Sequence, residues 1–261
     1  MKLFITTKNL DYIRNTQEIE LLTKECGGCR PDIIASSAGK YPARMAHVIR
    51  KLITCRFNDY DEIFVGFAPQ LIIPFFEGKF RRYRNDGGKV TIDFFISVYD
   101  TLVNDRKKIK KGSVPASVAA WLDKRTISLA DNVVVDTKAH GEYFTENFGL
   151  SRDKMQVLYL EADKSVYYPH TVKRAEEDAD KRIILYFASM LPLQGVETVL
   201  EAAKLMKDDK NIIFKIIGPV KNKVIQDNIR YIDWLPQDRL SDAIAAVSYT
   251  HLRAHETRSN L

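Results

Sequence analysis

The chain has 261 residues, enough for two domains of ordinary size, and 45% of them are hydrophobic, which supports a packed core and excludes wholesale disorder. The net charge of +6 favours anionic partners such as phosphates, nucleic acid or an acidic membrane face, without choosing among them. No apolar run reaches the roughly 18 residues of a membrane-spanning helix. The apolar start of the chain is also too short for a signal peptide, so we expect a cytoplasmic protein.

The first half of the chain predicts an alternation of strands and helices. Apolar runs bounded by turn residues indicate strands at 2–7, 31–37, 61–67, 87–100, 131–137 and 154–160. Helical patterns occupy 15–25, 41–53, 113–130 and 138–149. Such an alternation predicts an α/β domain on a parallel sheet. Burial of both sheet faces explains why the strand runs are continuously apolar.

The segment 162–181 interrupts this alternation because it is polar, highly charged and contains Pro169. We place an interdomain linker at 166–181, between a first domain at 1–165 and a second at 182–246. The second domain repeats the α/β pattern. Its strands are expected at 182–189, 211–218 and 228–235, and its helices at 195–208 and 237–246.

Two loops of the second domain could bind a ligand, because parallel sheets bind ligands beyond the carboxyl ends of their strands. In FASMLPLQGVETVL, the backbone N–H groups near Gln194 and Gly195 open a helix and could hold a phosphate. Ser189 and Gln194 could add side-chain hydrogen bonds. In IIGPVKNK, Gly218 ends a strand and permits close approach. A loop followed by a helix is also common without a phosphate site, so both interpretations stay open here.

The order of motifs resembles that of a known enzyme family. The C-terminal domain of retaining family 4 glycosyltransferases is similar to the succession RIILYFASMLPLQGVETVLEAAKLM, NIIFKIIGPV and NIRYIDWLPQDRLSDAIAA. The end of their N-terminal domain resembles LADNVVVDTKAHGEYFTENFGLSRDKMQVLYLEADKSVYYP, and the likeness extends from about residue 90 to 246. It implies a GT-B-like fold of two Rossmann-like parallel-sheet domains. It also implies transfer of a sugar, with retention, from a nucleotide diphosphate donor to a glycan or lipid-linked acceptor, as in polysaccharide biosynthesis.

The resemblance also implies a set of donor-binding residues. These are Ser189, Gln194 and Gly195 for the diphosphate, and Gly218, Pro219, Tyr231, Asp233 and Trp234 for the nucleotide base. Many family members carry arginine and lysine at the positions of Ser189 and Gln194. Because both residues are neutral here, the diphosphate charge would be met by a helix dipole, backbone donors or other cations. No metal and no cofactor besides the donor is implied. The alternative is a non-catalytic nucleotide- or partner-binding protein of the same fold.

Polar residues of the first domain are candidates for the acceptor site. We expect FFISVYDTLVNDRKK to end a strand on the ligand side, which places Asp100 and Arg106 there. Asp100 would hold an acceptor hydroxyl, and Arg106 a phosphate or the acceptor. Alternatively, Asp100 caps a helix or turn, and Asp105 and Arg106 form a solvated pair.

Two basic clusters, KFRRYR at 79–84 and RKKIKK at 106–111, are candidates for membrane contact. They could dock on the inner membrane face where a lipid-linked acceptor resides, which would make the protein peripheral. A solvated surface is the alternative. Nucleic acid is not expected as a partner, because no RNA- or DNA-binding module is recognisable.

Other catalytic motifs receive no support. The chain contains neither G-x-G-x-x-G nor a Walker sequence, and no histidine lies near a nucleophile motif. Cys26 and Cys29 form a C-x-x-C pair, but they follow a helix whose C-terminal dipole disfavours a thiolate. We interpret them as ordinary loop cysteines.

The final stretch, VSYTHLRAHETRSNL, places His251 and His255 four residues apart, a spacing found in metal-binding helices. The same stretch resembles the translation of a transposase-type sequencing-library adapter over residues 247–256, and the adapter resumes in frame for the last two residues. We therefore expect 247–261 to be non-native and neither histidine to bind metal. The family resemblance predicts another strand and an acidic E-x7-E-type region after residue 246. We accordingly expect the second domain to be incomplete and the 261-residue chain to be inactive.

Overall fold

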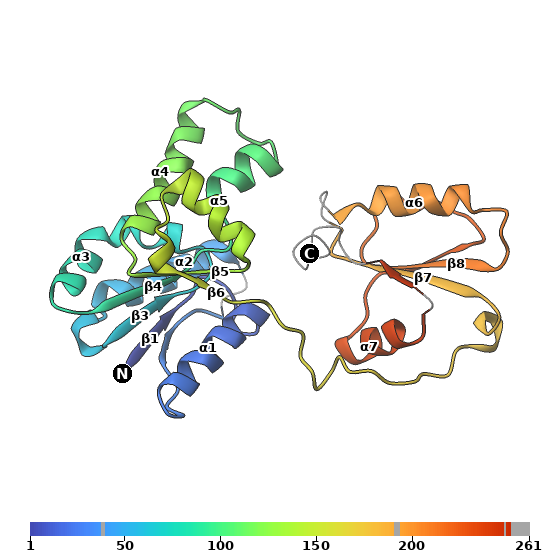
Figure 1. The fold of residues 1–261 in the computed structure, drawn as a ribbon, viewed down its shortest axis with the longest axis horizontal. Coiled ribbons are helices and arrows are strands. Elements are labelled where there is room, and N and C mark those ends of the chain that lie inside the picture. Colours follow the sequence, from blue (N-terminus) through green and yellow to red (C-terminus); the bar gives the residue numbers. More distant parts are fainter. Residues whose placement is uncertain (38–39, 191–193, 248, 252–261) are drawn as a thin grey trace. The chain divides into compact units, whose positions relative to one another are not determined.

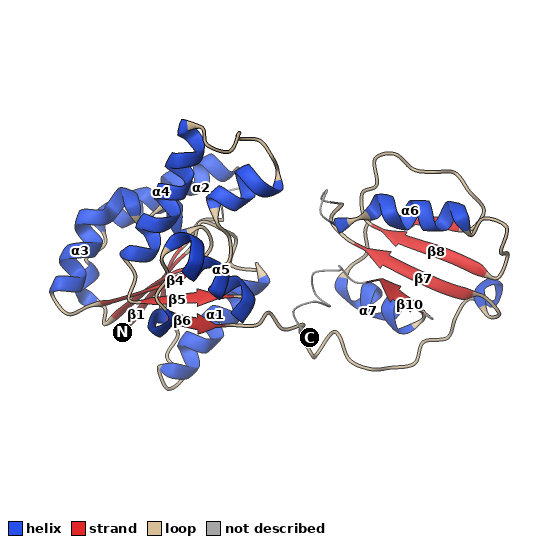
Figure 2. Ribbon diagram, turned by 45° about the horizontal axis from the view of Figure 1, so that its top comes forward, coloured by secondary structure: helices blue, strands red, loops and turns tan. Residues whose placement is uncertain are grey.

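The structure is a computed structural model that describes residues 1–37, 40–190, 194–247 and 249–251 (Figure 1). It divides the chain into two compact units, Met1–Leu160 and Glu161–Leu261. Each unit is built on a parallel sheet with helices packed against it, so the predicted α/β fold with two parallel sheets is confirmed (Figure 2).

The first unit contains a six-stranded parallel sheet in the order β2-β1-β3-β4-β5-β6. Its strands are β1 Lys2–Ile5, β2 Asp32–Ile34, β3 Glu62–Val65, β4 Lys89–Asp93, β5 Asn132–Val135 and β6 Met155–Val157. Its α-helices are α1 Ile13–Glu25, α2 Tyr41–Thr54, α3 Glu77–Asn85, α4 Val114–Ser128 and α5 Lys138–Phe148. The predicted strands and helices of this half are all present, and α3 is an addition that the sequence analysis did not include.

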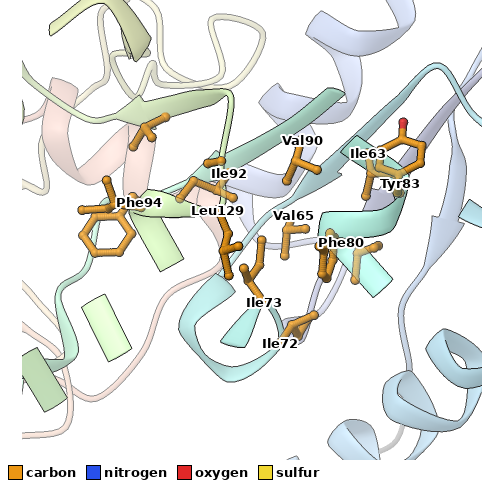
Figure 3. Close-up of a cluster of buried hydrophobic side chains, with 14 of the residues drawn as sticks. Ile63, Val65, Ile72, Ile73, Phe80, Tyr83, Val90, Ile92, Phe94 and Leu129 are labelled. Carbon is orange, nitrogen blue, oxygen red and sulfur yellow. The ribbon is translucent and has the colours of Figure 1, made fainter. Parts of the chain in front are cut away.

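Both faces of this sheet are buried, which accounts for its continuously apolar strands. In β1, Leu3 and Ile5 belong to the larger apolar cluster, with side chains from α2, α3, α4 and α5. Phe4, between them, points to the opposite face and packs with Ile19 and Leu22 of α1. Figure 3 shows the centre of the larger cluster, where strand and helix residues meet: Ile63, Val65, Val90, Ile92, Phe80 and Leu129.

One predicted strand is too long. The run 87–100 was expected to be extended throughout, but β4 ends at Asp93. The reason is Asp123, a fully buried carboxylate of α4. It accepts hydrogen bonds from the Ser97 hydroxyl at 2.8 Å and from the N–H groups of Val98 and Tyr99 at 3.0 and 2.9 Å. These bonds hold the chain in a helical start, which continues as the π-helix Asp100–Asp105.

The second unit contains a four-stranded parallel sheet in the order β10-β7-β8-β9. Its elements are β7 Arg182–Phe187, α6 Val196–Leu205, β8 Ile212–Ile217, β9 Ile229–Ile232, α7 Gln237–Ala245 and β10 Tyr249–His251. One face of the sheet packs against α6, whose Val196, Val199, Leu200 and Ala203 join Tyr186, Phe214, Ile216 and Ile229.

The strand β10 lies within the stretch that we expect to be non-native. Its residues pair in parallel with β7, Tyr249 opposite Ile184 and His251 opposite Tyr186. His251 is therefore in a strand and not in a helix, while His255 lies outside the described residues. No helix in the described part of the chain combines the length and apolar character that crossing a bilayer requires.

Candidate functional site

The carboxyl ends of β7, β8 and β9 meet at one edge of the second sheet. Gly218 follows β8, and its N–H donates to the carbonyl of Ile232 in β9, with an N···O distance of 2.8 Å. A Cβ at residue 218 would lie only 2.2 Å from the carbonyl oxygen of Ala188, after β7, and the backbone φ is +140°. Both facts require glycine here. Pro219, the next residue, is exposed at this edge.

The N-terminus of α6 follows the carboxyl end of β7. Gly195 is the N-cap residue with a φ of +72°, and because glycine has no side chain it cannot cap the N–H groups of the first turn. The N–H groups of that turn and the helix dipole therefore favour an anion. Glu197 lies in the same turn and opposes this effect with its negative charge.

The two residues predicted to bind the diphosphate with their side chains contact each other. The Ser189 hydroxyl lies 3.3 Å from Nε2 and 3.4 Å from Oε1 of Gln194. Ser189 is exposed, but Gln194 is buried, and its backbone carbonyl accepts a hydrogen bond from the Tyr186 hydroxyl at 2.8 Å. The structure thus brings Ser189, Gln194 and Gly195 together in one loop, while the Gln194 amide points to Ser189.

The residues predicted for the nucleotide base lie at the same edge but differ in their contacts. The Tyr231 hydroxyl is hydrogen-bonded to the backbone of Val224, 3.0 Å from its nitrogen and 3.2 Å from its oxygen. Asp233 forms an ion pair with Lys223 at 2.7 Å. Trp234 is 74% exposed. Tyr231 therefore anchors the loop before β9, and Trp234 has the free aromatic surface.

A second polar cluster lies at the carboxyl edge of the first sheet, and the sequence analysis missed it. Arg14 of α1 makes a two-point contact with Asp93, the last residue of β4, with Nε–Oδ2 and Nη2–Oδ1 distances of 2.7 Å. The guanidinium also donates to the Leu158 carbonyl at 3.4 Å and lies 4.8 Å from the centre of the Phe95 ring. Both charged side chains are buried.

Glu18, one turn further along α1, adds a third buried ionisable group. Its Oε1 is 3.6 Å from Nε of Arg14, too far for a hydrogen bond, and no described residue donates to either carboxyl oxygen. Burial first, and the negative charge of Asp93 second, raise the pKa of Glu18 well above its ordinary value. Glu18 therefore keeps its proton to a higher pH than an exposed glutamate does.

Asp136 and His140 form a partly exposed pair next to this cluster. Asp136 follows β5, His140 lies in the first turn of α5, and Oδ1 and Nδ1 are 2.7 Å apart. Burial would raise the pKa of Asp136, but the hydrogen bond and charge of His140, the charge of Arg14 and the Thr137 N–H together hold the pKa below its ordinary value. The carboxylate orients the imidazole, and with Nδ1–H donating to Asp136 the Nε2 atom can accept a hydrogen bond from a ligand hydroxyl. The sequence held a signal for this pair, an aspartate after a predicted strand with a histidine four residues later.

Asp100 and Arg106 do not end a strand, so that prediction is wrong in position. Asp100 begins the π-helix, and its Oδ1 accepts hydrogen bonds from the Tyr143 hydroxyl at 2.6 Å and from the Asn104 amide. Burial and the Asp100 carboxylate both raise the pKa of Tyr143. Arg106 follows the helix and is exposed, and its guanidinium has no partner within the described part of the chain. Their acceptor roles remain predictions.

The two basic clusters differ in how their charges are used. Most cations of 79–84 make contacts inside the fold: Lys79 with the Cys55 carbonyl (2.6 Å), Arg81 with Glu77 (2.8 Å) and Arg84 with Asp131 (3.0 Å). By contrast, none of the five basic side chains of 106–111 forms an ion pair with a described residue, and all five are exposed. Among the described residues, the second cluster presents five free charges to a partner, whereas Arg82 is the one cation of the first cluster outside these contacts.

No three histidine, cysteine, aspartate or glutamate side chains among the described residues lie close enough to hold a metal ion.

Solved structures of glycosyltransferases are similar to this chain in fold. Sucrose-phosphate synthase from Thermosynechococcus elongatus matches 96% of this chain and 74% of its own, at 12% identity and a TM-score of 0.63. WaaG, a glycosyltransferase involved in lipopolysaccharide biosynthesis, matches with the same coverage at 12% identity and a TM-score of 0.55. An α-glucosyltransferase solved with UDP and a 13-mer DNA matches 95% of this chain and 71% of its own, at 8% identity and a TM-score of 0.57.

The chain has a GT-B-like fold. No protein-family model and no curated protein matches its sequence. The likeness is therefore one of architecture, two Rossmann-like units that are each built on a parallel sheet.

Proposed function

We propose that this chain derives from a glycosyltransferase that moves a sugar from a nucleotide diphosphate-sugar to a glycan or lipid-linked acceptor, with retention of configuration. The observation that carries the proposal is the edge of the second sheet. There an uncapped helix N-terminus at Gly195 lies in the same loop as Ser189, and Gly218 follows the adjacent strand. This arrangement suits a diphosphate, whose charge the first-turn N–H groups of α6 would meet. The α-glucosyltransferase of similar fold was solved with UDP.

The remaining donor contacts follow from which groups are free. Trp234 offers an exposed ring on which a nucleotide base can stack, and Pro219 lies at the same edge. Because Tyr231 and Asp233 are engaged with the loop before β9, we assign them to shaping that loop. No metal is part of the proposal.

For the acceptor we propose the Asp136–His140 pair in addition to Asp100 and Arg106. A hydroxyl that donates to Nε2 of His140 would be held at the carboxyl edge of the first sheet. The nearby Arg14–Asp93–Glu18 cluster is buried and would fix the backbone of this edge without touching the acceptor.

Calorimetric titration of the 261-residue protein with UDP, ADP and GDP tests the donor site. We expect one nucleotide diphosphate to bind, and Ser189→Arg to tighten its binding about tenfold, because one charge-assisted contact contributes about 1.4 kcal/mol. Gln237→Arg, which adds the same charge at an exposed position of the same unit, is the matched control. Absence of binding by all three nucleotides would contradict the donor site.

Sugar transfer has to be measured on the complete gene product, because we propose that residues 247–261 are non-native. Sequencing the gene beyond codon 246 tests that proposal, and an in-frame continuation with an E-x7-E-type region is the expected result. Transfer from a radiolabelled nucleotide sugar, with the anomeric configuration read by NMR, then tests the reaction.

The second candidate is a non-catalytic nucleotide- or partner-binding protein of the same fold. It is favoured by the neutral Ser189 and Gln194, which contact each other where family members carry cations. Tight nucleotide binding by the complete protein, with neither transfer nor acceptor-free hydrolysis of any nucleotide sugar, would select this function.

A further inference from the structure

The helix α4 carries apolar side chains on its outer face as well as on its inner face. Ala116, Ala119 and Ile127 are buried against the sheet and its neighbours, as expected of a covering helix. Val114, Val118 and Trp121 are spaced four and three residues apart, which aligns them along one side of the helix. They are 78%, 51% and 54% exposed. We call these three residues the α4 stripe.

Of the two basic clusters, the lysine-rich loop directly before α4 is the one in which no charge is paired with a described residue. It contains Arg106, Lys107, Lys108, Lys110 and Lys111, all exposed. Asp105 is the single acidic residue next to it, and it forms no ion pair with the loop in the described part of the chain. Strong positive charge and an exposed apolar stripe therefore follow one another within sixteen residues, 106–121.

The loop and the stripe lie on a protrusion. Figure 1 shows the loop, in green, at the tip formed by the preceding helical segment and the start of α4, and Figure 2 shows the same arrangement from another angle. The Ser113 hydroxyl accepts a hydrogen bond from the Ala116 N–H at 3.4 Å and begins the helix where the loop ends. The cap thus fixes the basic loop next to the first residue of the stripe.

The charge and the apolar stripe together select the class of partner. A second copy of this surface would bring ten like charges together, which opposes a two-fold dimer. Nucleic acid would use the lysines but would have no use for two valines on the helix beside them. An anionic lipid surface uses both, because lysines approach the head groups while valine and tryptophan enter the boundary with the acyl chains.

We propose that the α4 stripe and the loop 106–111 form a docking surface for an anionic phospholipid membrane. Docking would present the first unit to acceptors held at a lipid surface. Vesicle binding does not require sugar transfer, so failure of this proposal and failure of the proposed function are distinguishable.

The experiment uses the tryptophans as reporters, since the chain has only Trp121 and Trp234. In Trp234→Phe protein, emission comes from Trp121 alone. We expect vesicles of phosphatidylcholine with 30% phosphatidylglycerol to sediment this protein and to shift its emission to shorter wavelength. Pure phosphatidylcholine vesicles should do neither, and 0.5 M salt should release the protein.

Two sets of variants separate the contributions of charge and apolar surface. Lys108→Gln, Lys110→Gln and Lys111→Gln together should weaken vesicle binding about a hundredfold, since each lysine near the surface contributes roughly a factor of five. The matched control removes three exposed lysines of the second unit, Lys204, Lys207 and Lys210, and should change binding little.

Val114→Ser with Val118→Ser should abolish the emission shift and weaken binding about tenfold. Leu205→Ser, at a residue that is 87% exposed on α6, is the apolar control and should leave binding unchanged.

Any of the following results would overturn the proposal. These are sedimentation without a Trp121 shift, equal binding to neutral and anionic vesicles, equal loss in the control variants, and a concentration-dependent Trp121 shift without lipid, which would identify a second copy as the partner. Binding to heparin or DNA with no affinity for anionic vesicles would likewise replace the membrane by a polyanion.

Discussion

Arg14 and Asp93 lie 79 positions apart in the sequence and form a two-point ion pair that is almost completely buried, 3% and 1% exposed. The pair joins α1 to the carboxyl end of β4. A buried charge that loses its partner destabilises the fold far more than the intact pair stabilises it, because the remaining charge stays desolvated. The integrity of this sheet edge therefore depends on both residues.

Arg14→Met is predicted to lower the free energy of unfolding of the first unit by about 3–5 kcal/mol, because it leaves Asp93 unpaired. Urea unfolding followed by Trp121 fluorescence measures the change. Arg84→Met is the control, since Arg84 and Asp131 are both partly exposed, and it should cost about 1 kcal/mol or less. Equal losses in the two variants would contradict the role of burial, and Arg14→Met with Asp93→Asn should recover part of the stability.

The variant Glu18→Gln tests whether the raised pKa of Glu18 makes stability depend on pH. Folded protein keeps the Glu18 proton at pH values where the unfolded chain has lost it, because the pKa of Glu18 is raised on folding. The folded state then binds more protons, so this contribution to stability falls as pH rises above the ordinary glutamate pKa of about 4.3.

Glutamine has nearly the same size as glutamate but cannot ionise. We therefore expect the variant to gain stability relative to the parent protein as pH rises from about 5 to 8, as measured by urea unfolding at each pH. Exposed Glu20→Gln is the control and should show a constant difference. A difference for Glu18→Gln that stays flat with pH would mean that Glu18 is ionised in the fold.

Gly218→Ala is predicted to destabilise the second unit by about 3 kcal/mol or more, because it combines a forbidden φ with overlap against the Ala188 carbonyl. Gly195→Ala has a positive φ but nothing within 4 Å of the new Cβ, so it should cost only about 1–2 kcal/mol. Thermal unfolding followed by Trp234 fluorescence ranks the two. A larger loss of stability for Gly195→Ala than for Gly218→Ala would show that the strand ends at this edge can separate easily.

Asp178 offers a test of how the segment before β7 is held. Its carboxylate is 1% exposed and lies 2.7 Å from both Lys215 of β8 and Arg230 of β9. Burial would raise the pKa of Asp178, but Lys215 and Arg230 hold it below the ordinary value.

Asp178→Asn should therefore cost about 2–4 kcal/mol at neutral pH. The cost should shrink as pH falls through the ordinary aspartate pKa of about 3.9, because the unfolded chain then gains a proton before the folded state does. Unfolding of the second unit at several pH values gives both quantities, with exposed Asp227→Asn as the control. A cost independent of pH would show that the charge of Asp178 has no role.

Local patterns predicted most of the elements because their signals are contained within each segment. The Ser113 cap and the Gly149 end, with its φ of +77°, are examples of single residues that mark helix boundaries correctly. The prediction of a strand over the whole of 87–100 was wrong for the opposite reason. Its apolar residues suit a strand, but the hydrogen bonds that end β4 come from Asp123, which lies more than twenty residues later.

The position of the edge that we propose for the donor could be predicted, because Gly195 and Gly218 follow strands that the sequence shows clearly. The Arg14–Asp93 pair could not be predicted. The residues near each of them in the sequence do not show that it is buried and paired instead of exposed at the surface. The basic clusters were indistinguishable by composition as well. The two clusters differ in which acidic residues the fold brings close to them, such as Asp131 beside Arg84.

The unpaired cations of the loop 106–111 affect how the first unit diffuses toward a charged partner. The cations of 79–84 are mostly engaged within the fold, whereas the loop 106–111 gathers five exposed cations without an ion pair among the described residues at one tip of the first unit. Such an asymmetric charge gives the unit a permanent dipole moment. In the field of a negatively charged body the unit will rotate during diffusion, so its encounters begin tip first and their rate falls as ionic strength rises.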